Sequence, residues 1–224
     1  ISFFKTQEVK TGQFVADTIF TSSGTGGETS KHRVEDLSVY EESFNLGFQH
    51  FYGNPEDWCI LALLPSYLER EGSSLIYMAE ALIEQSNDED SNFYLNQWEQ
   101  LYEVLQRKKD KGKKTLLLGV SFALLDFVEK HNLHFPALIA METGGMKGRR
   151  KEMIRSDLHH ILKIGFGVEY IHSEYGMTEL LSQAYSKGEG QFACPPWMQV
   201  FTRQTDDPFS SVKKGKTGGL NVID

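Results

Sequence analysis

Hydroxyl residues and glycines are concentrated in one stretch near the start of the chain, Thr21-Ser22-Ser23-Gly24-Thr25-Gly26-Gly27. Residues 18–20 precede it with the pattern of a strand. Glycines allow successive N–H groups to converge on an anion, and hydroxyls add donors without steric bulk. The stretch therefore predicts a phosphate-binding loop for which pyrophosphate is a natural ligand, with an ordinary surface loop as the alternative.

A second group of chemically useful side chains is Tyr175-Gly176-Met177-Thr178-Glu179, which follows a predicted strand at 168–172 and opens a predicted short helix. An aromatic face stacks on a base, a hydroxyl donates to a phosphate, and a carboxylate binds a hard cation through oxygen. The alternative is a simple strand-to-helix turn in which Thr178 caps the helix and Glu179 favours its dipole. The occurrence of both loops in this order favours the functional interpretation.

Other catalytic or nucleotide-binding motifs are incomplete. Gly215-Lys216-Thr217 copies the end of a Walker loop, but Ser210 stands where the first glycine is required. Neither His-Glu-x-x-His nor Gly-x-Ser-x-Gly occurs in the chain. The histidines are therefore interpreted as structural, with His172, just before the second loop, as the one candidate for chemistry.

Strand-like and helix-like periodicities alternate along most of the sequence and would position these loops. Predicted strands lie at 59–64, 115–120, 137–142 and 168–172. Predicted helices are one at 37–51, one capped by Ser73 or Ser74 with a stripe from Leu75 to Ile83, one carrying Tyr94, Trp98, Leu101 and Leu105, one capped by Ser121 and ending near His131, and one at 151–164 with Ile154 in its buried stripe. Such alternation predicts an α/β fold, a mostly parallel sheet with helices on both faces and ligands at the carboxyl ends of strands.

The pattern changes after residue 190 to shorter strand-like pieces at 198–202 and 218–223. The sequence therefore predicts an α/β core over 1–190 and a β-rich carboxy-terminal edge that begins a subdomain over 191–224. The chain begins at Ile1 rather than Met and stops at Asp224 within a predicted strand, so we expect an ordered fragment of a longer protein.

Composition excludes several classes of protein. With 224 residues, 40% of them hydrophobic and 24% charged, the chain is predicted to be globular. The net charge of −8 disfavours nucleic acid as a partner. The longest nearly apolar stretch, 116–128, is too short and too interrupted for a membrane span. Cys59 and Cys194 form no disulfide framework or zinc-ribbon pattern, which fits a reducing cytoplasm.

The two loops resemble those of the adenylate-forming superfamily of acyl- and aryl-acid ligases, whose phosphate loop reads T-S-G-T-T-G and whose later loop reads Y-G-x-T-E. The second loop matches at all four defined positions, whereas 21–27 carries an extra serine and one threonine-to-glycine change. Segments 64–70, 142–153 and 219–224 resemble the phenylacetate-ligase branch and, more closely for 142–153, the acyl-protein synthetases of the bacterial luminescence fatty-acid reductase system. The resemblance covers nearly the whole chain.

The resemblance implies the large amino-terminal domain of this fold, with ATP and Mg²⁺ as cofactors. Residues 21–27 would bind the β- and γ-phosphates, 143–145 would line the adenine and Tyr175 would stack on it. Thr178, at the α-phosphate, and Glu179, on Mg²⁺, would be the catalytic residues. The implied nucleotide-binding residues are Thr21, Ser22, Ser23, Gly24, Thr25, Gly26, Gly27, Thr143, Gly144, Gly145, Tyr175, Gly176, Met177 and Thr178. The implied acyl-pocket residues are Gly119, Val120 and Ser121. Lys147, Arg149, Arg150 and Lys151 would neutralise phosphate charge or form a solvated loop face.

The resemblance also implies activation of a fatty acid, or another small carboxylic acid, to an acyl adenylate and then acyl transfer to a protein thiol. An acyl-CoA reductase-type protein would be the partner. The alternatives are an aryl- or acyl-coenzyme A ligase of the phenylacetate type and a non-catalytic scaffold of the same fold. The resemblance also implies a ribose-binding Asp, a catalytic Lys and an acceptor Cys beyond Asp224. Neither Cys59 nor Cys194 is a convincing acceptor.

Overall fold

A computed structural model describes residues 2–22, 29–64, 72–146, 148–207, 209–213 and 215–224. Its largest sheet has the strand order β4-β3-β5-β6-β7-β8-β9. The strands are β3 (Cys59–Leu63), β4 (Asn92–Phe93), β5 (Thr115–Val120), β6 (Ile139–Thr143), β7 (His172–Tyr175), β8 (Ala184–Ser186) and β9 (Phe192–Ala193). Pairing is parallel from β4 to β7 and antiparallel from β7 to β9. The predicted α/β fold with a mostly parallel sheet is confirmed.

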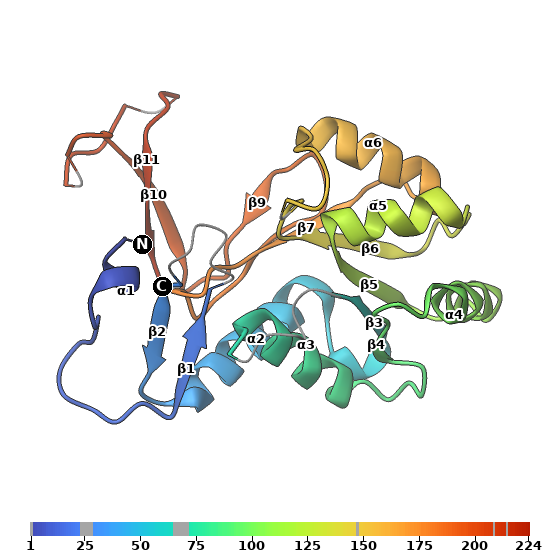
Figure 1. Ribbon diagram of the computed structural model, residues 1–224, viewed down its shortest axis with the longest axis horizontal. Helices are drawn as coiled ribbons and strands as arrows, with labels where there is room; N and C mark the ends of the chain where they lie inside the picture. The colour runs from blue at the N-terminus through green and yellow to red at the C-terminus, as the bar shows by residue number, and fades with distance from the viewer. Residues whose placement is uncertain (1, 23–28, 65–71, 147, 208, 214) are drawn as a thin grey trace.

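Helices cover both faces of this sheet. Figure 1 shows α5 and α6 together on one face and α2 and α3 on the other. The helices are α2 (Leu37–Tyr52), α3 (Ser74–Gln85), α4 (Trp98–Asp110), α5 (Ser121–Lys130) and α6 (Arg155–Phe166). Gly165 permits close contact between α5 and α6, because a Cβ there would lie 2.4 Å from Cβ of Val128. α4 packs beside α5, where the rings of Tyr102 and His131 stack with centroids 5.0 Å apart.

The core is densest around β3 and β5, whose side chains are all covered. Every residue of β3 and β5 is buried, which accounts for their continuous apolar runs, as expected for parallel strands covered on both faces. The predicted cap of α3 is also present, because Ser73 Oγ accepts a hydrogen bond from the Ile76 N–H at 3.4 Å.

Two small sheets and two short helical segments complete the described chain. β1 (Thr18–Thr21) and β2 (Lys31–Val34) form one antiparallel hairpin, and β10 (Gln199–Arg203) and β11 (Gly219–Ile223) form another. The latter projects away from the large sheet (Figure 1). The helical segments are α1 (Ser2–Thr6) and the 3-10 turn Pro55–Asp57. Strands near 198–202 and 218–223 are therefore confirmed, whereas the boundary at residue 190 stays a prediction.

Three predicted elements differ from those observed. α6 begins at Arg155 rather than 151, and Ile154, expected in its buried stripe, precedes it and is exposed. Tyr94 lies outside α4, because its N–H donates to the Ala62 carbonyl at 2.8 Å in continuation of β4. β7 begins at His172 instead of ending there, because pairing with β6 starts where His172 faces Met141. For Tyr94 and His172, a partner distant in sequence overrides the local apolar pattern.

None of the described helices is both long enough and apolar enough to cross a membrane.

Candidate functional site

A cavity of about 670 Å³ lies at the carboxyl ends of β6 and β7, beside the β1–β2 hairpin. Thr21 and Ser22 line it from the hairpin, residues 143–146 line it from the end of β6, and residues 174–179 line it from β7 and the following loop. The structure therefore brings together the described parts of both predicted loops and the segment 143–145. This is the edge of the sheet where ligands bind in open α/β folds.

The base of the first loop is held by a pair of serines. The Ser22 N–H donates to the Ser30 carbonyl at 3.0 Å, and Ser22 Oγ accepts from the Ser30 N–H at 2.8 Å. Ser30 Oγ is buried, lines the cavity and has no hydrogen-bond partner among the described residues. An unpaired buried hydroxyl in a cavity is available to a polar ligand. Ser23, Gly24, Thr25, Gly26 and Gly27 lie outside the described residues.

The second loop begins with Tyr175 as the last residue of β7. A Cβ on Gly176 would lie 2.6 Å from Glu174 Oε1, so a larger residue would collide with that carboxyl group. Thr178 and Glu179 form a turn instead of the predicted short helix, because the chain returns directly to the antiparallel strand β8. The Thr178 carbonyl lies 2.9 Å from Nδ1 of His32 on β2, which ties the second loop to the hairpin that carries the first.

Tyr175 offers an aromatic surface at the cavity. The residue is 38% exposed, and its ring meets Phe192 edge-on with centroids 6.0 Å apart. Arg155 lies on the Phe192 ring at 5.0 Å and also lines the cavity. The arrangement provides stacking surface and positive charge on the same side of the cavity.

Glu142, at the floor of the cavity, connects four elements. Its carboxylate accepts from Ser121 Oγ of α5 at 3.2 Å and from Ser173 Oγ of β7 at 2.8 Å. From α6, Nε of Arg155 and Nε2 of His159 each lie 3.6 Å from Oε1. Burial alone would raise the pKa of Glu142, but the approach of His159, the hydrogen bond from Ser173 and the charge of Arg155 outweigh it and lower the pKa.

The pKa of Glu174, the second buried acid that lines the cavity, shifts in the opposite direction. Its Oε2 accepts from Thr143 Oγ1 at 2.6 Å, and no ion pair reaches it among the described residues. Burial raises the pKa of Glu174 to about 7, with a further contribution from the charge of Glu142, although the hydrogen bond from Thr143 opposes the shift. The site therefore holds one ionised and one partly protonated carboxyl group at neutral pH.

Sequence reasoning missed both acids and Arg155. A signal was present for Glu142, because an acidic residue interrupts an apolar strand directly before Thr143. Glu174 likewise directly precedes a predicted site residue, Tyr175. Arg155 carried no signal, because the segment 147–155 is rich in basic residues and the sequence does not distinguish among them.

The predicted acyl-pocket residues are placed differently from one another. Ser121 lines the cavity, but its hydroxyl donates to Glu142 rather than capping α5, whose N-cap is Val120. Val120 is fully buried outside the cavity lining, and Gly119 packs against Leu124, whose Cδ2 would lie 2.6 Å from a Cβ on that glycine. Of the three, only Ser121 is positioned to touch a ligand.

The basic residues expected to neutralise phosphate charge are likewise placed differently from one another. Arg150 turns to α5, where Nε donates to Asp126 at 2.7 Å and Nη1 donates to Glu129 at 2.6 Å. Arg149 lies on the Phe122 ring at 5.7 Å. Lys151 is exposed and does not line the cavity, and Lys147 lies outside the described residues. Arg155 and Lys5 line the cavity in their place.

His172, the histidine singled out from the sequence, is structural. Its Nδ1 lies 3.1 Å from the Tyr52 hydroxyl, away from the cavity lining. Burial, assisted by the charge of Lys187, lowers the pKa of His172 to about 4. Cys59 is buried on β3, and its burial raises the pKa of the thiol to about 12, which agrees with the expectation that it is no acceptor.

Asp224 ties β11 to the segment that follows the second loop. Its Oδ2 accepts from the N–H groups of Leu181 at 2.7 Å and Ser182 at 2.8 Å. The Ser182 hydroxyl donates to the other carboxylate oxygen. The hairpin β10–β11 is thus anchored next to Gln183, which lines the cavity.

Comparisons with known proteins give matches among solved structures only. A scan against known protein families matches none, and a search of curated proteins finds no match. O-succinylbenzoate coenzyme A synthetase from Bacillus subtilis, in complex with ATP and magnesium ion, superposes with a TM-score of 0.59 and 16% identity over 96% of this chain and 43% of that chain. The chain has the fold of the amino-terminal domain of adenylate-forming enzymes.

Two further ligases support that conclusion. 2-Hydroxyisobutyryl-CoA ligase, in complex with 2-HIB-AMP and CoA, has a TM-score of 0.58 and 11% identity over 92% of this chain and 44% of that chain. Anthranilate CoA ligase, in complex with anthranoyl-AMP, has a TM-score of 0.55 and 15% identity over 96% of this chain and 40% of that chain. The chain thus spans less than half the length of each of these proteins. The expected fold is confirmed, and the luminescence branch stays a prediction.

Proposed function

We propose that the protein binds ATP and Mg²⁺ and activates a carboxylic acid as its acyl adenylate. The observation that carries the proposal is the single cavity in which the base of the first loop, segment 143–145 and residues 175–179 meet. The neighbours of the same fold crystallised with ATP, AMP or acyl-AMP add support. At this level of sequence identity their ligands serve as a hypothesis for this chain.

The cavity fits a nucleotide in its chemistry. Ser22 and the Ser30 hydroxyl, which has no partner among the described residues, line the cavity at the base of the loop assigned to phosphates. Gly144 and Gly145 have φ values of 75° and 70°, so the backbone after β6 turns where a side chain would strain it, and a flat base can approach closely. The exposed face of Tyr175 supplies the stacking surface assigned to the adenine.

In the proposed reaction a carboxylate oxygen attacks the α-phosphorus, and the bond to the bridging oxygen breaks to release pyrophosphate. ATP supplies the electrophile and the leaving group when bound. Thr178 donates to the α-phosphate, and Glu179 supplies an oxygen ligand for Mg²⁺. Arg155 and Lys5 reduce the repulsion between two approaching anions, because preorganised positive charge is most effective where negative charge develops.

Transfer of the acyl group to a thiol completes the proposed function. The resemblance to acyl-protein synthetases favours a fatty acid, a protein thiol and a reductase partner. The structural neighbours instead favour coenzyme A as the acceptor, because they are coenzyme A ligases. Incubating the full-length protein with labelled acid and ATP, with and without coenzyme A, distinguishes the two acceptors. Label on the protein supports a protein thiol, and a soluble thioester supports coenzyme A.

The test of acid activation uses carboxylate-dependent exchange of pyrophosphate into ATP by the full-length protein. We expect Glu179→Gln to reduce exchange about 100-fold while ATP binding by calorimetry weakens much less, because the lost charge acts on the metal in the transition state. Glu103→Gln removes the same charge from an exposed position on α4 and serves as the matched control. ATP binding without exchange for any acid would favour the non-catalytic scaffold.

A further inference from the structure

The cavity has an open end and a closed end. Tyr175 and Glu179 border the open end and are partly exposed. Tyr40 of α2, Met78 of α3 and Glu174 of β7 also line the cavity, and all three are buried. A triphosphate bound by Thr178 and Glu179 occupies the open end, so the closed end is left for the part of the acid that is remote from the reacting carboxylate.

The closed end contains a carboxyl group with unused capacity. Glu174 receives one hydrogen bond, from Thr143 Oγ1 to Oε2. Its Oε1 faces Gly176 and has no hydrogen-bond donor among the contacts of the described residues. Glu174 lines the cavity, so a ligand that enters it can supply a donor to this oxygen.

The groups around Glu174 provide no positive charge. The titratable neighbours that face it are Glu142 from β6, Tyr40 from α2, Tyr185 from β8 and Tyr175 from its own strand. Tyr40 already donates its hydroxyl proton to the Ser74 carbonyl at 2.8 Å. Burial raises the pKa of Glu174 to about 7, which is the expected consequence of a carboxyl group without a cation.

A further polar group adds to this character. Gln183 is buried and lines the cavity. Leu75 and Met78 provide apolar wall on the same side. The lining therefore suits a carbon skeleton that carries a polar substituent better than a plain alkyl chain, whose terminal methyl would leave the Glu174 oxygen unpaired.

We propose that the acid activated by this protein carries a hydrogen-bond donor, an ammonium or a hydroxyl group, that binds Oε1 of Glu174 at the closed end of the cavity. This inference rests on the proposed acid activation and deepens it. Glu174 is then a specificity-determining residue. An ammonium group would hold the carboxylate ionised, whereas a hydroxyl group would bind it in either protonation state.

The experiment measures carboxylate-dependent pyrophosphate exchange by the full-length protein with sets of acids matched in shape. Each set contains an amino, a hydroxy and a methyl form of the same straight-chain or benzoic acid. We expect kcat/KM for the best donor-bearing acid to exceed that of its methyl match by about tenfold or more, because a site built to bind a donor rejects the analogue that lacks it. The amino and hydroxy arms identify which donor is used.

Glu174→Gln supplies the residue-specific test. We expect this substitution to reduce the preference for the donor-bearing acid about tenfold through KM for that acid, with little change for the methyl match. Glu103→Gln should leave the preference unchanged. The wild-type comparison stands by itself if Glu174→Gln fails to fold.

The outcomes separate the two proposals. Equal or better exchange with methyl acids in the wild type would overturn the inference while leaving acid activation intact. An unchanged preference in a folded Glu174→Gln variant would show that Glu174 does not recognise the substituent. That result would also overturn the inference. If none of the acids supports exchange, the proposed function is overturned and the inference with it.

Discussion

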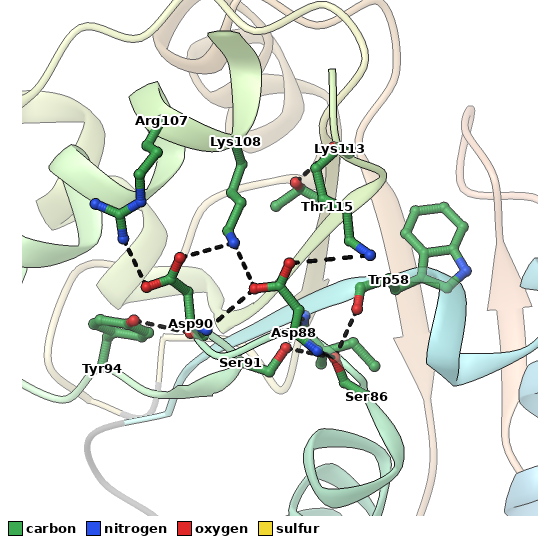
Figure 2. A network of polar contacts seen from close by, with 11 residues as sticks. Trp58, Ser86, Asp88, Asp90, Ser91, Tyr94, Arg107, Lys108, Lys113 and Thr115 are labelled. Carbon is green, nitrogen blue, oxygen red and sulfur yellow. Dashed lines mark hydrogen bonds and ion pairs between the residues drawn. The ribbon is translucent and has the colours of Figure 1, made fainter. Parts of the chain in front are cut away.

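Two carboxylate pairs lie at opposite ends of the strands of the large sheet and differ in how their charge is compensated. Figure 2 shows the first, in which Lys108 Nζ lies 2.5 Å from Asp88 and 2.7 Å from Asp90, and Arg107 contacts Asp90 at 2.6 Å. This cluster lies by the amino ends of β3 and β5, next to Trp58 and Thr115. The second pair, Glu142 and Glu174, lies at the carboxyl ends of β6 and β7.

The compensation determines the direction in which the pKa of each carboxyl group shifts. The hydrogen bond from Arg107 lowers the pKa of Asp90, and burial opposes but does not cancel the lowering of the Asp88 pKa by Lys108. At the other end of the strands the pKa of Glu174 is raised. The first pair therefore stabilises the fold at neutral pH, whereas Glu174 destabilises it and leaves a carboxyl group that a ligand can use.

Removal of the buried cation should have the largest effect. Lys108→Met removes the cation that Asp88 and Asp90 share in a largely buried site and leaves Arg107 on Asp90 and Lys113 at 3.9 Å from Asp88, so we expect the free energy of unfolding to fall by about 3 kcal/mol. Urea denaturation at pH 7 measures the change. Lys111→Met, at an exposed position after α4, is the control and should change stability by less than about 0.5 kcal/mol. Equal losses in both variants would refute the distinction.

Glu174→Gln should stabilise the protein at high pH. The unfolded-state pKa is 4.5 and the folded-state pKa is about 7, so the folded wild type loses stability as the pH rises from 5 to 8. The variant lacks this loss, and we expect it to be more stable by up to about 3 kcal/mol at pH 8 and about equal at pH 4. Denaturation curves at several pH values test this, and a variant that is less stable at pH 8 would contradict it.

Glu142→Gln should act in the opposite direction. The lowered pKa of Glu142 contributes stability that is present above the unfolded-state pKa and is lost as the pH falls through the lower folded-state value. We expect a loss of about 1.5 kcal/mol at pH 7, from weaker hydrogen bonds to Ser121 and Ser173, and a smaller loss at pH 4. A loss that is independent of pH would mean that the charge of Glu142 does not matter.

Arg150→Ala should have the smallest effect on stability and none on nucleotide binding. Its partners Asp126 and Glu129 are partly exposed, so we expect a loss below about 1 kcal/mol that diminishes with added salt. Arg155→Ala should instead weaken ATP binding, because only Arg155 of the two lines the cavity. Calorimetric titration of both variants with ATP distinguishes them, and the reverse result would move the positive charge of the site to Arg150.

The sequence determined the fold class and most of the strands and helices, and it predicts the roles of the two loops. These features depend on local patterns: buried parallel strands read as apolar runs at 59–64 and 115–120, and a glycine-rich loop or Tyr175-Gly176 is recognisable without its neighbours. Some boundaries and contacts were predicted wrongly, as for Tyr94, Ser121, the starts of α6 and β7, and the segment after Thr178.

The tertiary structure decided which side chains share the cavity and how they titrate. Glu142 and Glu174 become a pair only because β6 and β7 lie side by side with Glu142 opposite Ser173. The Thr143–Glu174 hydrogen bond joins residues 31 positions apart, and the selection of Arg155 over Arg150 depends on the packing of α5 against α6. A pKa depends on burial and on charges brought close in space, and neither is encoded in the local sequence.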